Sequence, residues 1–164
     1  MRAQAVKVRG LTQGEAALAV SVFGQAVVLD RVRLMAAPRP LNRAFVPGRW
    51  FGRDWIVWPH VSLLDDLSRG PLHGQATLIH ELVHVWQAQQ GVNLLIAKLR
   101  AGDSRASYRY PLDPACGWAS LNIEQQAMAI EHRFRLSRGG VVPADRAFYD
   151  RLCPFPAQDS AGGP

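Results

Sequence analysis

The pattern of apolar and polar residues predicts two long helices in the second half of the chain. Between about residues 71 and 90, apolar side chains occupy more than one face of the expected helix, which is typical of a buried helix, and Gly91 follows where that helix should end. Between about residues 122 and 138, apolar residues recur at the spacing of a single helical face, and Gly139 ends that stretch. We therefore expect one largely buried helix and a second that packs through one side.

The remaining pattern predicts shorter helices and a small sheet. Thr12 and Glu15 have the spacing of a capping box, in which each side chain binds a free amide of the first turn, so a helix should run from there to Phe23. We interpret this stretch as a folded helix rather than a secretory leader, because polar residues interrupt its beginning. Strands are predicted at 26–35, 43–46, 54–58 and 106–112, the segment 94–100 fits helix or strand, and a short helix is expected at 144–152.

Length and composition indicate one domain. A chain of 164 residues with 48% hydrophobic and 20% charged residues is long enough to enclose a core. We expect a single domain over residues 1–153 and a disordered tail over 154–164, where Pro, Gly, Ala and Ser dominate. No stretch approaches the length of about 18 apolar residues that a membrane span requires, so none is predicted.

Charge and cysteine content narrow the functional class. The net charge is +6, yet the arginines are scattered and form no basic run interleaved with aromatic residues, so nucleic-acid binding is not expected. Two cysteines, Cys116 and Cys153, are too few for a disulfide framework. We predict two reduced thiols, which favours a cytoplasmic protein.

The string HELVHVWQ at residues 80–87 carries the clearest chemistry. Residues four apart on a helix lie one turn above each other, so His80 and His84 present their imidazoles side by side. Zn²⁺ binds imidazole nitrogens at about 2.0–2.1 Å, and Glu81 is placed to act as a base on water without binding the metal. The alternative is a pair of core histidines that donate to backbone carbonyls. We favour zinc, because two imidazoles and a carboxylate on a buried helix need partners.

A third protein ligand is required, and Glu124 is the better candidate. It lies at the start of the next long helix, 40 residues after His84, which leaves enough chain to return to the metal. His132 is a weaker candidate, and Glu131 is a replacement ligand or a hydrogen-bond partner of one of the two histidines. Glu124 also has a plain alternative role, as a first-turn carboxylate that interacts with the helix dipole.

Other polar residues are weaker candidates. Tyr110 or Tyr108 is placed to donate a hydrogen bond to an oxyanion near the zinc, although a tyrosine pair in a strand is more often packing. Gln87 is expected to hydrogen-bond a ligand, and Trp86 to pack in the core. The polar residues upstream of the motif are expected to be surface or turn residues, and they are His60, Asp65, Asp66 and His73.

Several sequence blocks resemble the Vgr-related proteins, bacterial zinc-peptidase-like proteins found near type VI secretion genes. The resemblance runs from about residue 11 to residue 135, and its blocks are LTQGEAALAVSVFGQAVVLDRVRL (11–34), HELVHVWQAQQG (80–91), YRYPL (108–112) and LNIEQQA (121–127). The family pattern implies His80 and His84 as ligands, Glu81 as the base, and Glu124 as the third ligand. It implies no substrate.

The combined prediction is an α+β, zincin-like protein with a gluzincin-type core of two helices and a small, mostly antiparallel sheet. We expect a zinc metallopeptidase that hydrolyses peptide bonds in a peptide or protein substrate, with Zn²⁺ as cofactor. The alternative is a non-catalytic zinc module that serves secretion-system proteins, and a basic nucleic-acid binder is a third, weaker reading. A cytoplasmic location is expected, with export by a contractile secretion system as a further route.

Overall fold

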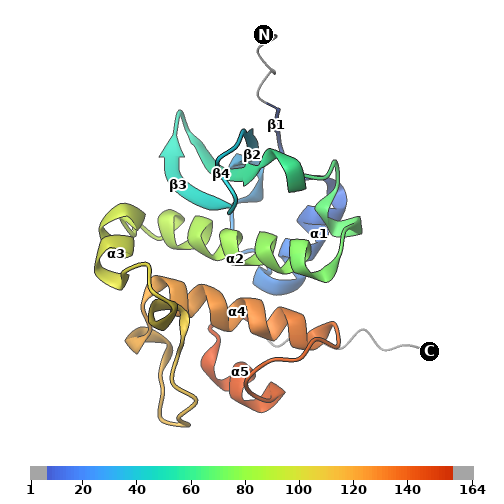
Figure 1. Cartoon of the computed structure of the whole chain (residues 1–164). Coiled ribbons are helices and arrows are strands. Elements are labelled where there is room, and N and C mark those ends of the chain that lie inside the picture. Colours follow the sequence, from blue (N-terminus) through green and yellow to red (C-terminus); the bar gives the residue numbers. More distant parts are fainter. Residues whose placement is uncertain (1–6, 157–164) are drawn as a thin grey trace, which may run out of the picture.

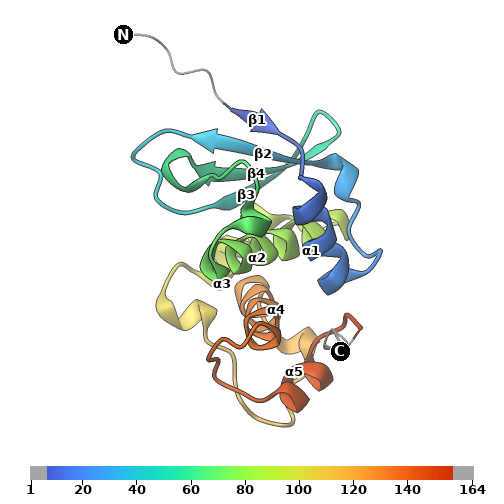
Figure 2. The ribbon, with the colours of Figure 1, turned by 90° about the vertical axis from the view of Figure 1, so that its right-hand side faces the viewer.

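A computed structural model of the chain describes residues 7–156 and has an α+β fold (Figure 1). The sheet, the helix that carries the motif, and the second long helix lie in successive layers, and the views in Figures 1 and 2 agree on this order. The helices are α1 (Gln13–Phe23), α2 (Leu72–Gln89), α3 (Leu94–Ala101), α4 (Ile123–Ser137) and α5 (Arg146–Leu152). The strands are β1 (Val8–Arg9), β2 (Val32–Ala37), β3 (Phe45–Trp50) and β4 (Arg53–Pro59).

The sheet is mixed rather than mostly antiparallel. Its strand order is β1-β2-β4-β3, and β2 pairs with β4 in parallel along its whole length. The two outer pairings are antiparallel, as expected for a strand pair joined by a hairpin turn such as β3 and β4. The parallel pair arises because the chain crosses to the sheet edge for β3 before it returns as β4 beside β2. Hydrophobic periodicity does not report this choice of neighbour.

The predicted helices are confirmed, and their caps account for their ends. Thr12 and Glu15 form the expected capping box, and Gly24 follows α1 with a φ of 57°. Asn122 and Gln125 form a second capping box at the start of α4. The ambiguous segment 94–100 is helical, and Asn93 caps it through the amide of Ile96.

Two strand predictions need correction. The segment 26–35 contributes only its end to β2, because residues 29–31 form a short 3-10 turn first. The segment 106–112 is not a strand: Arg105–Tyr108 form a 3-10 turn, and no strand follows there. Alternating side chains suggested a strand, but the described sheet provides no partner strand for this segment.

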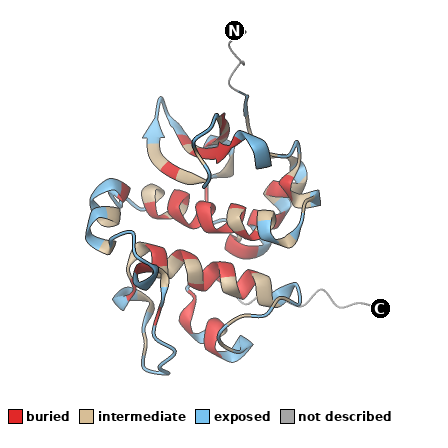
Figure 3. Cartoon of the chain, in the orientation of Figure 1, coloured by how far each residue is buried: buried red, intermediate tan, exposed pale blue. Residues whose placement is uncertain are grey.

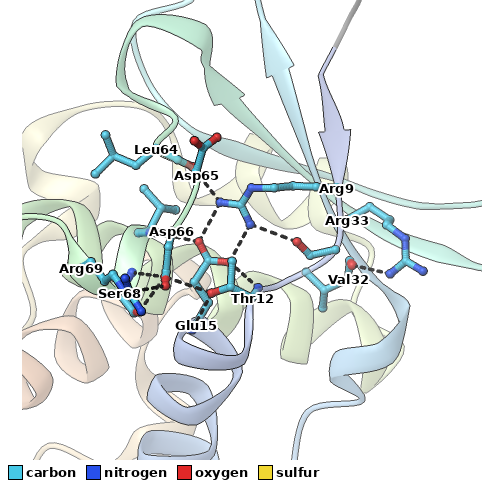
Figure 4. A network of polar contacts seen from close by, with 12 residues as sticks. Arg9, Thr12, Glu15, Val32, Arg33, Leu64, Asp65, Asp66, Ser68 and Arg69 are labelled. Carbon is cyan, nitrogen blue, oxygen red and sulfur yellow. Dashed lines mark hydrogen bonds and ion pairs between the residues drawn. The ribbon is translucent and has the colours of Figure 1, made fainter.

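A buried carboxylate joins the N-terminal region to the segment that leads into α2 (Figure 4). Glu15 is fully buried; one oxygen accepts from the backbone N–H of Leu67 at 2.8 Å, and the guanidinium of Arg9 donates to both oxygens at 2.7 Å. Beside it, Asp66 accepts from the hydroxyl of Thr12 at 2.9 Å and caps the turn at Ser68. These bonds hold the segment before α2 against α1.

The described C-terminal residues pack into the core. Arg133 is buried, and its guanidinium donates to the backbone carbonyls of Phe155 and Pro156. The ring of Phe155 makes edge contacts with Phe23 and Trp86. Of the tail predicted at 154–164, residues 157–164 lie outside the described residues.

Most of α2 and the inner face of α4 belong to the buried core, as the red segments of Figure 3 show. Cys116 and Cys153 are free thiols, and burial raises the pKa of Cys153 to about 12. Within residues 7–156, no helix is long and apolar enough to cross a membrane.

Candidate metal centre

Three buried side chains from α2 and α4 converge at one point. His80 and His84 lie one turn apart on α2, and Glu124 lies in the first turn of α4. Their candidate ligand atoms all lie within 4.8 Å of one another. Ala127, one turn after Glu124, has no exposed surface, and its small side chain lets the two helices approach closely. The packing of the two long helices therefore brings together the three residues that the sequence singled out.

The two separations between Glu124 and the imidazole nitrogens fit a zinc ion. Oε2 of Glu124 lies 3.4 Å from Nε2 of His80 and 3.2 Å from Nε2 of His84. Donors in a tetrahedral zinc site, each about 2.0–2.1 Å from the metal, are separated from one another by about 3.3 Å. Two imidazole nitrogens and one carboxylate oxygen are also a donor set that zinc accepts.

Each imidazole is oriented by a further residue through its other nitrogen. Nδ1 of His80 lies 3.0 Å from Oε2 of Glu131, and Nδ1 of His84 lies 2.8 Å from Oε1 of Gln87. The amide nitrogen of Gln87 in turn donates to the carbonyl of Ile123 and to Oε1 of Gln126, which leaves its oxygen to face the ring. Such partners fix the tautomer and direct the Nε2 lone pairs at a metal.

The hydrogen-bond pattern brings an acceptor atom of His84 and an acceptor atom of Glu124 together. Because Nδ1 of His84 donates its proton to the Gln87 oxygen, a neutral ring has only a lone pair at Nε2. That lone pair would face the carboxylate oxygen of Glu124, which is also an acceptor. A metal ion between the two atoms would remove the repulsion.

The pKa values of His80 and Glu124 are shifted by their hydrogen bonds within the cluster. Burial lowers the pKa of His80, but the hydrogen bonds with Glu124 and Glu131 outweigh burial and raise the pKa to about 10. Burial raises the pKa of Glu124, yet its hydrogen bonds with His80 and His84 hold that pKa well below its ordinary value. The His80 ring thus lies between two carboxylates, one at each nitrogen, and both favour its protonated form.

Glu81 borders a large cleft beside this cluster. The cleft has a volume of about 960 Å³, and its walls include residues from β3, α2 and α3. Glu81 is 5% exposed, and its Oε2 atom is buried without a hydrogen-bond partner among the described residues. Buried polar atoms normally have partners, so an unpartnered carboxylate oxygen beside the cluster is unusual.

The tyrosines predicted near the metal separate in the structure. Tyr108 lines the cleft and contacts Asp103 through its hydroxyl. Tyr110 does not line the cleft: its hydroxyl lies between His132 and the hydroxyl of Tyr149. Burial and the bond with Tyr149 raise the pKa of Tyr110. His132, the weaker ligand candidate, is likewise occupied by Tyr110 and is not part of the cluster.

The polar residues that precede the motif in the sequence do not gather at one site. His73 lines the cleft, whereas His60 is exposed. Asp65 pairs with Lys7 at the surface, and Asp66 belongs to the network around Thr12.

Sequence reasoning missed two cations near the centre. Nζ of Lys98 lies 3.7 Å from Oε1 of Glu124, and the guanidinium of Arg135 lies 2.7 Å from Oε1 of Glu131. Arg135 stands four residues after Glu131, which is the spacing of a helical ion pair and was visible in the sequence. Lys98, one of two lysines in the chain, lies in an apolar segment that gave no sign of its neighbour.

Comparisons with known proteins relate this chain to a secretion-system protein. No protein-family model matches the chain. The chain is similar to the type VI secretion system spike protein VgrG2b of Pseudomonas aeruginosa, with 32% identity over 90% of this chain and 15% of that protein. It is also similar to the solved effector domain of VgrG2b, with a TM-score of 0.66, 29% identity, and coverage of 87% of this chain and 79% of that domain.

The chain is homologous to this effector domain. The predicted relationship to a type VI secretion protein is therefore confirmed as homology to its effector domain. The chain spans about 15% of the length of the full spike protein, so the match concerns the effector domain rather than the rest of the spike. The expectation of a metallopeptidase family stays a prediction.

Proposed function

We propose that this chain is a zinc-dependent peptidase domain that acts as an effector of a type VI secretion system. The secretion context rests on the homology to the effector domain of VgrG2b. Secretion-system proteins and a peptide or protein substrate are then its partners. A cytoplasmic location before export is part of the same proposal.

The metal-binding part rests on one observation: the Nε2 atoms of His80 and His84 both face Oε2 of Glu124 at the separation of zinc ligands. These three side chains would hold Zn²⁺ and join α2 to α4, which makes a zincin-like core of two helices. Glu131 and Gln87 would keep the imidazoles in the required tautomer.

The catalytic part rests on Glu81. Glu81 lines the cleft, and its carboxylate would accept a proton from a water and return it to the leaving amine. A bound zinc ion supplies Lewis acidity, which acidifies water and polarises a carbonyl group.

The test compares the wild type with Glu81→Gln and His84→Ala. Zinc content is measured by elemental analysis, and hydrolysis is measured by mass spectrometry of a mixed peptide library. We expect about one zinc ion per wild-type chain, full zinc without hydrolysis in Glu81→Gln, and neither in His84→Ala. His60→Ala is the matched control, because His60 is exposed and outside the cluster. A metal-free wild-type chain that cannot be loaded with zinc would overturn the proposal.

A non-catalytic zinc module is the second candidate. The homology to a spike-protein effector domain supports association with a secretion system and requires no catalysis. The three ligands are also 9% exposed or less, which suits a structural staple. If Glu81→Gln and the wild type bind zinc equally and neither cleaves any peptide of the library, this second reading replaces the peptidase.

A further inference from the structure

The tip of the β3–β4 hairpin exposes two adjacent aromatic side chains. Trp50 is 53% exposed and Phe51 is 98% exposed. Figure 2 shows the β3–β4 connection projecting beyond the sheet, and Figure 3 shows its tip as exposed. Within residues 7–156, Phe51 has no ring stacking or cation contact, so its apolar surface gains nothing from the fold.

The backbone at the tip makes a phenylalanine there more unusual. Trp50 pairs with Arg53, so Phe51 and Gly52 form a two-residue turn. Their φ angles are 53° and 69°, and a turn with both angles positive favours Asn, Asp or Gly. Phe51 is the one non-glycine residue with positive φ in the described part of the chain. A large apolar residue in a disfavoured conformation and in water indicates a role outside folding.

Arginines lie in the tip itself and in the segment that leads into the neighbouring strand β2. Arg49 and Arg53 flank it, and Arg53 and Arg33 both donate to the backbone carbonyl of Asp30. Carbonyl partners leave the guanidinium charge uncancelled, and Arg31 adds a further exposed cation. Two aspartates oppose the charge of these four arginines. Asp30 is exposed, and Asp54 is buried and pairs with Arg49.

We infer that the β3–β4 tip, defined as Arg49–Arg53, docks this protein on an anionic phospholipid bilayer. Trp50 and Phe51 would enter the interface between head groups and acyl chains, where aromatic side chains are favoured, and the arginines would contact the anionic head groups. A second protein is a poorer fit, because a stable protein interface covers about 800 Å² per partner and a protruding turn offers two side chains. A bilayer accepts a single inserted point.

The tip and the cleft are separate parts of the molecule. Phe45, at the start of β3, lines the cleft, whereas Trp50 at the end of β3 and Phe51 in the turn do not. Substitutions at the tip therefore leave the metal centre intact, and the docking inference does not depend on the proposed peptidase.

The test measures how much of the full chain sediments with lipid vesicles. One vesicle population contains phosphatidylglycerol and phosphatidylcholine in equal amounts, and the other contains phosphatidylcholine alone. The key variant is Phe51→Asn, which removes the apolar ring but suits the positive φ and should fold at least as stably as the wild type. The control is Val141→Asn, which removes a fully exposed apolar side chain far along the sequence from the tip.

We expect the wild type and Val141→Asn to bind the anionic vesicles equally. Phe51→Asn should bind at least about tenfold more weakly, because the buried ring area is lost. Arg53→Gln should weaken binding about fivefold, because one cation near the surface is lost. Binding should also fall as salt concentration rises.

Three results would overturn the inference. The first is no binding of the wild type to anionic vesicles, and the second is equal binding by the wild type and Phe51→Asn. The third is self-association of the wild type, seen by light scattering without lipid and abolished by Phe51→Asn, which would make the tip a contact between copies of the chain. Thermal melting of every variant excludes misfolding as the cause of a loss.

Discussion

Nδ1 of His80 lies 3.0 Å from Oε2 of Glu131, so a carboxylate of α4 orients an imidazole of α2. Glu131 is itself held by Arg135, four residues later on the same helix. The pair links the metal centre to the outer part of α4. The sequence left two roles open for Glu131, metal ligand or hydrogen-bond partner of a histidine. In the structure Glu131 contacts the His80 ring and is not one of the three clustered ligands.

Removing this carboxylate should weaken zinc binding. Residues that orient metal ligands typically change metal affinity about 10–100-fold when they are replaced, and we expect a loss of this size in Glu131→Ala. Glu131→Gln keeps an acceptor for His80 and should lose less. Calorimetric titration with zinc gives the affinities, and equal dissociation constants for all three proteins would show that Glu131 does not orient the ring.

Zinc removal should destabilise the protein, because the three ligands come from two helices that are far apart in the sequence. A ligand that binds only the folded state adds about 4 kcal/mol to the free energy of unfolding when its concentration is about a thousand times its dissociation constant. Denaturant unfolding with zinc and with a chelator measures this difference. His84→Ala should unfold at the same denaturant concentration in both conditions, and a zinc-dependent shift in that variant would point to another binding site.

The Glu15 network should be a major source of stability. Glu15 is fully buried and accepts from Arg9, Thr12 and Leu67, so Glu15→Ala leaves buried donors unpaired. We expect a loss of about 3 kcal/mol or more in the free energy of unfolding. Lys7→Ala, which removes an exposed ion pair nearby, should leave unfolding unchanged. Similar unfolding curves for both variants would show that Glu15 does not hold the segment before α2 against α1.

His132 should make stability depend on pH. Its pKa is lowered from 6.5 mainly by burial, so the folded protein favours the neutral ring more strongly than the unfolded chain does. The resulting stability is fully present above pH 6.5 and is lost as the pH falls through the lower folded pKa. Denaturant unfolding of the wild type and His132→Gln at several pH values should show their difference changing in this window. A constant difference would mean that His132 does not titrate on unfolding.

The local features of the sequence determined the helices and much of the candidate site. The capping pairs Thr12–Glu15 and Asn122–Gln125 mark helix starts because they satisfy amides within one turn. His80 and His84 face the same way because a helix repeats nearly every four residues. The choice of Glu124 needed one assumption about tertiary structure, that the second long helix packs against the first.

Tertiary packing alone decided the features that depend on neighbours from distant parts of the chain. The parallel β2–β4 pair, the place of Lys98 beside Glu124, and the separation of Tyr108 from Tyr110 all depend on where the chain returns in space. The alternation that predicted a strand at 106–112 describes side-chain direction only, and a strand also needs a partner with free backbone groups. Spacing along a chain constrains residues within a few turns, whereas contacts over 40 residues are selected by the burial of whole faces.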